Sequence, residues 1–410
     1  MTAVAVVIPH YDQQQQLDLV LAALELQTWP SAQLEVVVSD DGSPRPPRLG
    51  RRPYRTRLVQ QRDLGFRAAA ARNLGAAASD GDLLCFLDGD TVPEPGYVQA
   101  MVTAAAGRDV LVVGRRRHAD LAGFSRLQLQ QFLLRTDGHP MPREYPEPQW
   151  LVDAFCRTEN LAKADDASYR FIISAVMAMP RSLFDAVGGF EPAFTSYGGE
   201  DWELANRCWL TGADFVHAPD AVAWHDGPDF AGRGHDEAAV KNAEGLSVAR
   251  FITDPAARGH GLWWSQPDVV VTLDDTGWSD AEVLLTVASL LRDTDVGLWL
   301  PGASPRRDLE PLDRDPRVRF GPPPADVLRR CRYRAEVAQP VVLDDTTLRQ
   351  VCAVAPVHLL EGLTVRRTRD LSRGDLAAPA SNEFAARRPQ GSHLQQVWGR
   401  AARQSAAGRI

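Results

Sequence analysis

The first ninety residues alternate between short apolar runs and longer segments with helical spacing. Residues 3–8 (AVAVVI) form an apolar, β-branched run that ends at a proline, as a buried strand does. Residues 14–28 carry leucine and valine near helical spacing, and residues 34–38 (LEVVV) form a second apolar run. Strand, helix and strand in this order predict a βαβ unit, and therefore a parallel sheet covered by helices.

The same alternation continues to about residue 230, which indicates one α/β domain over residues 1–260. In chain order, the pattern predicts a strand at 57–60, a helix at 66–78, a strand at 83–87, a helix at 96–106, a strand at 110–114, a loop at 137–150, a strand at 171–179, a helix at 181–187, an amphipathic segment at 202–211 and a strand near 214–217.

After about residue 260 the pattern starts again. A strand at 267–275, a helix at 281–292 and a strand at 296–302 repeat the order of the first three elements. A strand at 318–320, a helix at 325–337 and the segment 341–348 then echo residues 57–60, 66–78 and 85–92. We interpret residues 261–379 as a smaller, diverged α/β module that repeats half of the first sheet. Residues 380–410 are small and polar, and are expected to form a loosely ordered tail.

Composition and charge limit the classes of binding partner and the cellular compartment that we expect for the protein. The chain has 410 residues, with 53 acidic and 45 basic side chains and a net charge of −8, so we expect no nucleic-acid partner. No apolar stretch is long enough for a transmembrane helix, and the N-terminus lacks the basic region of a signal peptide. Five cysteines without zinc-site spacing indicate reduced thiols. A cytoplasmic protein is expected, with peripheral membrane attachment and a homodimer left open.

Two carboxylates separated by one residue follow the predicted strand at 83–87. Asp88 and Asp90 can both approach a divalent ion, and oxygen ligands of this kind suit Mg²⁺ or Mn²⁺. Alone, a D-x-D motif after a strand is a weak signal and is more typical of a solvated turn. However, the second strand also ends in acids, at Asp40-Asp41-Gly42-Ser43, and parallel strands place their carboxyl ends at one ligand-binding edge.

Taken together, these motifs resemble the family 2 glycosyltransferases, which have a GT-A fold. The resemblance rests on the segments VVIPHYD, LQTWP, VVVSDDGS, the G-x-x-x-A-x-A-R-N stretch of 65–73, CFLDGDTVP and GGFEPAFTSYGGEDWELANR, which cover roughly residues 3–230. It implies a mixed, mainly parallel sheet flanked by helices.

The resemblance also assigns residues to the donor and its metal. It implies that Pro9 and Tyr11 line the nucleotide pocket and that Asp41 contacts the base, usually uracil. It places Arg72 near the nucleotide, Asp88 near the ribose and the metal, and Asp90 on the metal itself. His225 is expected to be the third metal ligand, since several GT-A enzymes have one far downstream of the D-x-D motif.

A second acidic pair stands at Gly198-Gly199-Glu200-Asp201. Two glycines allow a tight turn and a close approach to a ligand, while the acids would favour the start of a helix by their charge alone. By resemblance, Asp201 is the general base that takes the proton from the acceptor hydroxyl, and Glu200 holds the acceptor or shapes the site.

The expected function is therefore that of an inverting, metal-dependent glycosyltransferase that uses Mn²⁺ or Mg²⁺ and a nucleotide-diphosphate sugar, with a UDP-sugar expected. Two alternatives stay open: a sugar nucleotidyltransferase, against which the PHYD strand end counts, and a nucleotide-sugar-binding protein without turnover. The acceptor is equally open among glycan, lipid-linked, natural-product and peptide hydroxyls. In residues 261–379, Asp344-Asp345 is expected to replace the D-x-D motif and no GGED follows, which predicts a non-catalytic module.

Overall fold

The structure, a computed structural model, divides into two units, Met1–Val248 and Ala249–Ile410, called here the first and the second unit. The residues that it describes are 2–107, 109–229, 237–259, 262–292, 295–302, 309–344, 347–354, 357–360, 362–375, 386–387 and 394.

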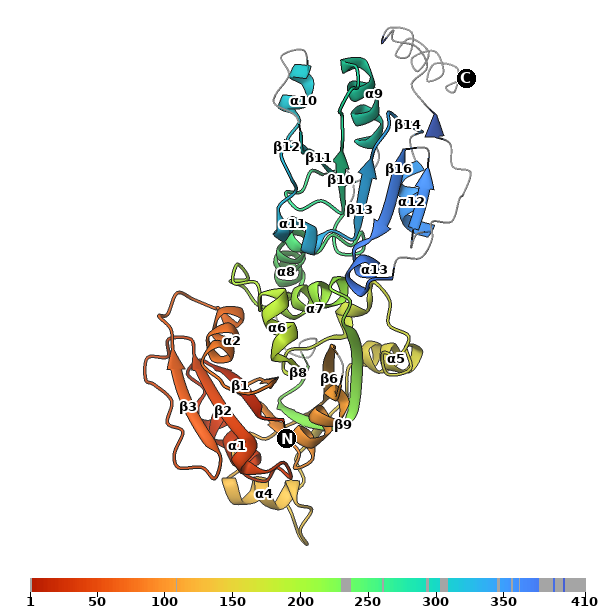
Figure 1. Cartoon of the computed structure of the whole chain (residues 1–410). Helices are drawn as coiled ribbons and strands as arrows, with labels where there is room; N and C mark the ends of the chain where they lie inside the picture. Colours follow the sequence, from red (N-terminus) through yellow and green to blue (C-terminus); the bar gives the residue numbers. More distant parts are fainter. Residues whose placement is uncertain are drawn as a thin grey trace. The chain divides into compact units, whose positions relative to one another are not determined.

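A nine-stranded mixed sheet forms the centre of the first unit (Figure 1). The order is β3-β2-β1-β4-β8-β6-β9-β5, and β7 pairs with β6. The strands are β1 (Val4–His10), β2 (Leu34–Asp40), β3 (Arg55–Gln60), β4 (Leu83–Leu87), β5 (Thr91–Pro93), β6 (Val110–Ala119), β7 (Glu144–Tyr145), β8 (Val176–Pro180) and β9 (Asp214–Asp226). Strands β3, β2, β1 and β4 are parallel, whereas β8 runs antiparallel to both of its neighbours. The predicted mixed α/β sheet is confirmed.

Helices cover this sheet and bury its apolar strands. The helices in this part of the chain are α1 (Gln14–Leu24), α2 (Ala68–Ala77), α3 (Tyr97–Ala105), α4 (Arg126–Leu133), α5 (Gln149–Arg157), α6 (Arg181–Val187), α7 (Glu200–Leu210) and α8 (Glu237–Phe251), which continues past the end of the first unit, together with short 3-10 turns at Ser31–Gln33 and Ser168–Phe171. Every residue of β2 and β4 is buried, which explains why these strands have continuous apolar runs instead of an alternating pattern.

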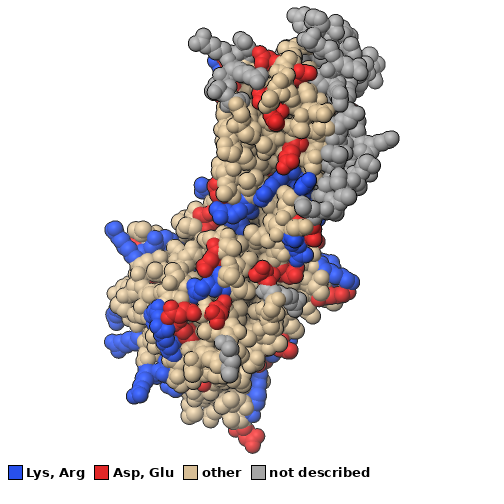
Figure 2. Space-filling view, in the orientation of Figure 1, with Lys and Arg blue, Asp and Glu red and all other residues tan. Residues whose placement is uncertain are grey.

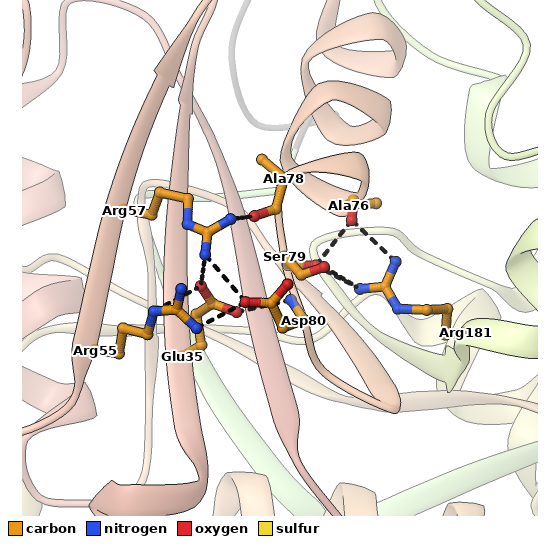
Figure 3. A network of polar contacts seen from close by, with 8 residues as sticks. All are labelled: Glu35, Arg55, Arg57, Ala76, Ala78, Ser79, Asp80 and Arg181. Atoms are coloured by element: carbon orange, nitrogen blue, oxygen red, sulfur yellow. Dashed lines mark hydrogen bonds and ion pairs between the residues drawn. The ribbon is translucent and has the colours of Figure 1, made fainter.

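Arginines fix the carboxyl end of α2 against the sheet (Figure 3). Arg181 donates hydrogen bonds to the carbonyl oxygens of Ala76 and Ser79, both at 3.0 Å, and to the Ser79 hydroxyl at 2.6 Å. Arg57 donates to the carbonyl oxygen of Ala78. These bonds give further partners to carbonyl groups at the end of the helix, and the positive charges favour its C-terminus. Helix α2 is thereby held in a fixed position on the sheet.

Three sequence predictions for the first unit are wrong in part. The segment 137–150, expected to be a loop, contains β7 and the first residues of α5. Residues 171–175 do not belong to a strand, because a 3-10 turn ends at Phe171 and β8 begins only at Val176. The segment is apolar because it is largely buried, and burial alone does not separate a strand from an irregular segment. The strand expected near 214–217 continues to Asp226, so His225 lies within β9 and not in a loop after it.

The second unit contains a six-stranded sheet of the order β12-β11-β10-β13-β16-β15. Its elements are β10 (Val269–Leu273), α9 (Asp280–Leu290), β11 (Val296–Leu300), α10 (Glu310–Arg314), β12 (Val318–Phe320), α11 (Ala325–Arg330), β13 (Tyr333–Val337), α12 (Thr347–Val354), β15 (Val357–Leu360), β16 (Leu363–Arg367) and α13 (Thr368–Arg373); β14 (Val342–Leu343) pairs separately with β17 (Ala386–Arg387). Strands β12, β11, β10 and β13 are parallel and β16 is antiparallel to both neighbours, as in β3-β2-β1-β4-β8-β6. The predicted smaller α/β module is confirmed.

The correspondence between the two sheets corrects the second half of the predicted repeat. Residues 325–337 are not one helix, because α11 ends at Arg330 and 333–337 form β13. The side chains of Tyr333, Ala335 and Val337 are buried in alternation, which is the strand period that the prediction overlooked. Strand β13 therefore holds the place of β4, and Ala338-Gln339-Pro340 follows it where Asp88-Gly89-Asp90 follows β4.

The acidic pair at 344–345 consequently does not stand in for the D-x-D motif. Asp344 follows β14, which lies outside the six-stranded sheet, and Asp345 lies outside the described residues. Most of the predicted tail at 380–410 also lies outside them. The division into a catalytic and a non-catalytic domain stays a prediction. Among the helices that the structure describes, none has the length and apolar character needed to span a membrane.

Charged side chains of both signs are scattered over the surface. On the face drawn in Figure 2, Lys and Arg side chains are interspersed with Asp and Glu side chains. The net charge of the whole chain is −8, and the absence of a nucleic-acid partner stays a prediction.

Candidate active site

A cavity of about 700 Å³ opens in the first unit at the carboxyl ends of the parallel strands β1, β2 and β4. Eight of the nine residues that the sequence assigned to the site line this cavity: Pro9, Tyr11, Asp41, Arg72, Asp88, Asp90, Glu200 and Asp201. The ninth, His225, is not among the lining residues, but its Nε2 lies 3.6 Å from Oδ2 of Asp90. The parallel topology explains the convergence, because it brings strand ends that are far apart in the sequence to one edge.

Asp41 is held rigidly at the end of β2. Its carboxylate accepts hydrogen bonds from the Gln61 side chain at 2.5 Å and from the backbone N–H of Arg67 at 2.8 Å. Gly42 follows with φ +88°, and a Cβ at this position would lie 2.3 Å from the backbone nitrogen of Asp63. The glycine in SDDGS is therefore required by a tight turn that brings the Asp63 segment against the strand end.

Tyr11 stands at the mouth of the cavity with 47% of its surface exposed. Its hydroxyl donates a hydrogen bond to Asp63 at 3.4 Å. The negative charge of Asp63 raises the pKa of Tyr11, so the phenol stays protonated and remains a donor near neutral pH. The exposed ring is free to receive a planar group.

Arg72 connects the two acidic motifs, although 128 positions of the sequence separate it from Glu200. Its guanidinium donates to Asp88 at 2.7 Å and to Glu200 at 2.9 Å, and the side chain is only 4% exposed. Burial by itself would lower the pKa of Arg72, but the carboxylates of Asp88 and Glu200 outweigh it and raise that pKa. Arg72 is thus permanently charged and fixes the distance between the D-x-D and E-D motifs.

Asp90 and His225 face one another at the other side of the D-x-D motif. Their Oδ2 and Nε2 atoms are 3.6 Å apart, and β5 pairs with β9 so that Thr91 is opposite His225. The Nδ1 atom of His225 lies 3.2 Å from the carbonyl oxygen of Gly227, which orients the ring. Asp88 is turned toward Arg72 instead.

The arrangement of these side chains tests whether a divalent ion fits. No group of three or more His, Cys, Asp or Glu side chains that could hold a metal ion occurs among the described residues. A carboxylate beside an oriented imidazole nevertheless matches the donor set of a Mn²⁺ or Mg²⁺ ion that shares its remaining positions with substrate phosphates. The residues present therefore fit a metal that binds together with a phosphorylated substrate.

Asp201 lies at the start of α7, where the chain turns sharply into the cavity. Gly198 and Gly199 have φ of +91° and +93°, and a Cβ on Gly199 would lie 2.5 Å from the Val248 side chain. The Asp201 carboxylate accepts from the backbone N–H of Ser174 at 3.3 Å. Burial, reinforced by the charge of Glu200, raises the pKa of Asp201 to about 7. A carboxyl group with that pKa can exchange a proton near neutral pH.

Several further residues line the cavity without having been marked by the sequence. They are acids, bases and exposed aromatic rings: Asp63, Phe66, Arg116, Trp150, Tyr197, Asp229, Lys241 and Glu244. Isolated aromatic and charged residues carry no motif, and Arg116 lies two positions beyond the strand predicted at 110–114, so none of these residues had a usable signal in the sequence. Together with the predicted set, they give the cavity both charged and apolar walls.

Comparison with known proteins identifies the family. The profile described as Glycosyl transferase family 2 matches residues 5–188, and that described as the N-terminal domain of galactosyltransferase matches residues 161–223. Glycosyltransferase AglE of Haloferax volcanii is 33% identical over 234 residues, which are 55% of this chain and 68% of AglE. The chain belongs to glycosyl transferase family 2. The family and the mixed sheet together show a GT-A-type fold.

Two further known proteins are similar to parts of this chain. Validoxylamine A glucosyltransferase of Streptomyces hygroscopicus subsp. limoneus is 34% identical over 217 residues, which are 50% of this chain and 47% of the relative, so the chain spans about half of that protein. Among solved structures, mannosyltransferase PcManGT from Pyrobaculum calidifontis, in complex with GDP-Man and Mn²⁺, is 18% identical with a TM-score of 0.41, covering 62% of this chain and 66% of that one.

Proposed function

We propose that the chain is an inverting glycosyltransferase that moves a sugar from a nucleotide-diphosphate donor to an acceptor hydroxyl. One observation carries the proposal: Arg72 ties Asp88 of the D-x-D motif to Glu200, the neighbour of Asp201, within one cavity of about 700 Å³. Donor-side carboxylates and a carboxyl group suited to act as a base would then share one space that is large enough for a nucleotide sugar.

The nucleoside end of the donor is assigned to the β1 and β2 ends. The Asp41 carboxylate, fixed by Gln61 and Arg67, is an acceptor for the imide N–H of uracil, and the exposed Tyr11 ring can stack against the base. A UDP-sugar is therefore the donor that we propose. Pro9 lines the same end of the cavity.

The diphosphate end is assigned to Asp90 and His225, which would hold Mn²⁺ or Mg²⁺ together with the donor. When bound, such an ion neutralises the negative charge that develops on the diphosphate as it leaves. Asp88 is directed by Arg72 toward the ribose side of the same motif. The metal and its identity belong to this proposal.

Asp201 is assigned the role of general base. Its carboxylate takes the proton of the acceptor hydroxyl while the hydroxyl oxygen bonds to the anomeric carbon, and the bond from that carbon to the diphosphate oxygen breaks. Attack from the side opposite the leaving group inverts the anomeric configuration. A pKa of about 7 makes Asp201 a stronger base than an ordinary aspartate while leaving it largely ionised at slightly alkaline pH.

The acceptor binds on the α7 side, where the wall contains Trp150 and Tyr197, whose surfaces are 51% and 48% exposed. Exposed rings that line a cavity offer flat apolar surfaces to a sugar or another ring. The relatives act on different acceptors by name, so glycan, lipid-linked, natural-product and peptide hydroxyls remain the candidate classes.

Turnover of a set of nucleotide sugars in the presence of Mn²⁺ tests the proposal. The native chain should hydrolyse or transfer from one donor, with UDP-sugars the expected class, and Asp201→Asn should reduce the rate by a factor of roughly 10² to 10⁴ while still binding the donor. A nucleotide-sugar-binding protein without turnover would bind the same donor and show no difference between the two chains. Equal turnover by both would refute the assignment of Asp201.

A further inference from the structure

The charge of the cavity poses a problem for a diphosphate. Eight carboxylates line it: Asp41, Asp63, Asp88, Asp90, Glu200, Asp201, Asp229 and Glu244. Among the described lining residues, the cations are Arg72, Arg116 and Lys241. A nucleoside diphosphate brings further negative charge, so a protein cation beside its phosphates would contribute strongly to binding.

Two of these three cations are poorly placed for the phosphates. Arg72 is buried and uses both terminal nitrogens of its guanidinium on Asp88 and Glu200. Lys241 donates to Glu244 at 2.7 Å, and the Glu244 side chain packs so closely on Gly198 that a Cβ there would lie 2.9 Å from it. Lys241 is therefore on the side of α7 and not on that of the D-x-D motif.

Arg116 is the cation on the side of Asp90 and His225. Neighbouring residues of a strand point to opposite faces, and β6 has an arginine at three consecutive positions. Arg115 is paired with Glu147 at 2.6 Å, and neither residue lines the cavity. Arg116 lies on the face that lines the cavity.

The pairing of β6 with β9 places Arg116 close to the proposed metal ligands. His118, two residues along the same face of β6, is the register partner of His225, and the two rings are 5.1 Å apart. His225 in turn lies 3.6 Å from Asp90. The guanidinium of Arg116 therefore belongs to the part of the cavity where the donor diphosphate is expected.

The contacts of Arg116 leave binding capacity unused. Its Nη2 donates to Asp229 at 3.0 Å, while its buried Nε has no hydrogen-bond partner in the described part of the chain. The side chain is 16% exposed, so it can be reached from the cavity. A guanidinium that makes one bond to one carboxylate can take a phosphate group on its remaining donors, since its planar fork suits two oxygens at once.

We propose that Arg116 binds the diphosphate of the donor and that Asp229 occupies the same guanidinium when the donor is absent. This inference rests on the proposed function, because it assumes a nucleotide-diphosphate donor. Phosphate oxygens and the Asp229 carboxylate then compete for one guanidinium. Without the donor, Asp229 is the counter-ion that keeps the Arg116 side chain in position. Removing Arg116 should therefore lower the affinity for the donor, and removing the charge of Asp229 should raise it.

Calorimetric titrations of the full chain with UDP and with uridine, both with Mn²⁺, test the proposal. Arg116→Ala should weaken UDP binding by roughly tenfold or more and leave uridine binding unchanged, because only UDP carries the phosphates. Asp229→Asn should tighten UDP binding. Arg115→Ala is the matched control, since it removes the same charge from the adjacent position of β6 on the other face, and it should have no effect.

The outcomes separate this inference from the proposed function. If the native chain does not bind UDP, both are overturned. If the native chain binds UDP and Arg116→Ala binds it equally well, or loses UDP and uridine in equal proportion, only the role of Arg116 is refuted. If Arg116→Ala does not fold, Asp229→Asn decides: unchanged or weaker UDP binding contradicts the competition, and tighter binding supports it.

Discussion

Replacing Asp201 by asparagine should make the stability of the protein less dependent on pH. The pKa of Asp201 is raised from 3.8 to about 7, so between these values the folded state holds a proton that the unfolded state has released. Stability therefore falls as the pH rises through this interval, and the whole penalty is present above pH 7. At 1.36 kcal/mol per pKa unit, the penalty reaches at most about 4 kcal/mol.

The asparagine variant carries no such penalty, because its side chain stays neutral. We expect it to match the native chain in stability near pH 4 and to exceed it by roughly 2–4 kcal/mol at pH 8, the lower figure allowing for the partial exposure of the side chain. Urea unfolding at several pH values between 4 and 8, followed by circular dichroism, measures the difference. Asp137→Asn, which changes an exposed acid of the same unit, is the control.

Parallel pH dependences of the native chain and Asp201→Asn would refute the reasoning, since they would mean that folding does not perturb this carboxyl group. The same group should control catalysis. In the native chain, kcat/KM should rise with pH up to about 7 and then level off, because only the ionised carboxylate accepts the proton of the hydroxyl. A profile already flat from pH 5 upward would exclude Asp201 as the base.

Three more outcomes follow from the geometry. Asp90→Ala should abolish the gain in UDP affinity that Mn²⁺ gives, and calorimetry that finds the gain intact would remove Asp90 from the metal site. Gly75→Ala should lower the free energy of unfolding by roughly 1–3 kcal/mol, because the added Cβ would lie 2.5 Å from the Val7 side chain, and an unchanged urea midpoint would contradict this close packing. Trp150→Ala should raise the acceptor KM several-fold while leaving donor hydrolysis unchanged, so an equal effect on both reactions would argue against an acceptor wall.

The sequence predicted the part of the site that depends on backbone topology. Asp41 and Asp88 follow short, β-rich apolar runs that predict buried strands, and parallel strands bring their ends to one edge of the sheet. The two glycines before Glu200 likewise predicted a sharp turn, and both have positive φ in the structure. These features follow from local patterns, which is why the sequence is sufficient for them.

The rest of the site depends on contacts between distant segments. That Arg72 would be shared by Asp88 and Glu200 is not visible in any window of the sequence, because 128 positions separate Arg72 from Glu200. Arg116 was overlooked for a related reason: a run of three arginines has no periodic signal, and only the strand geometry divides the run between two faces. Side-chain direction is therefore the information that the sequence lacked.

The second unit shows that a similar sheet can carry different residues at its strand ends. Its six strands repeat the order and the directions of the first sheet, so the backbone would present a comparable edge to a ligand. At the position after β13, however, the chain carries Ala338-Gln339-Pro340 in place of two carboxylates. Function depends on the residues at the site and not on the fold itself. With these residues at the end of β13, the second unit has the fold but not the carboxylates that phosphate and metal binding would need. We therefore propose that the second unit is non-catalytic, and that adding Asp or Glu at residue 338 or 340 alone would not create a donor site there.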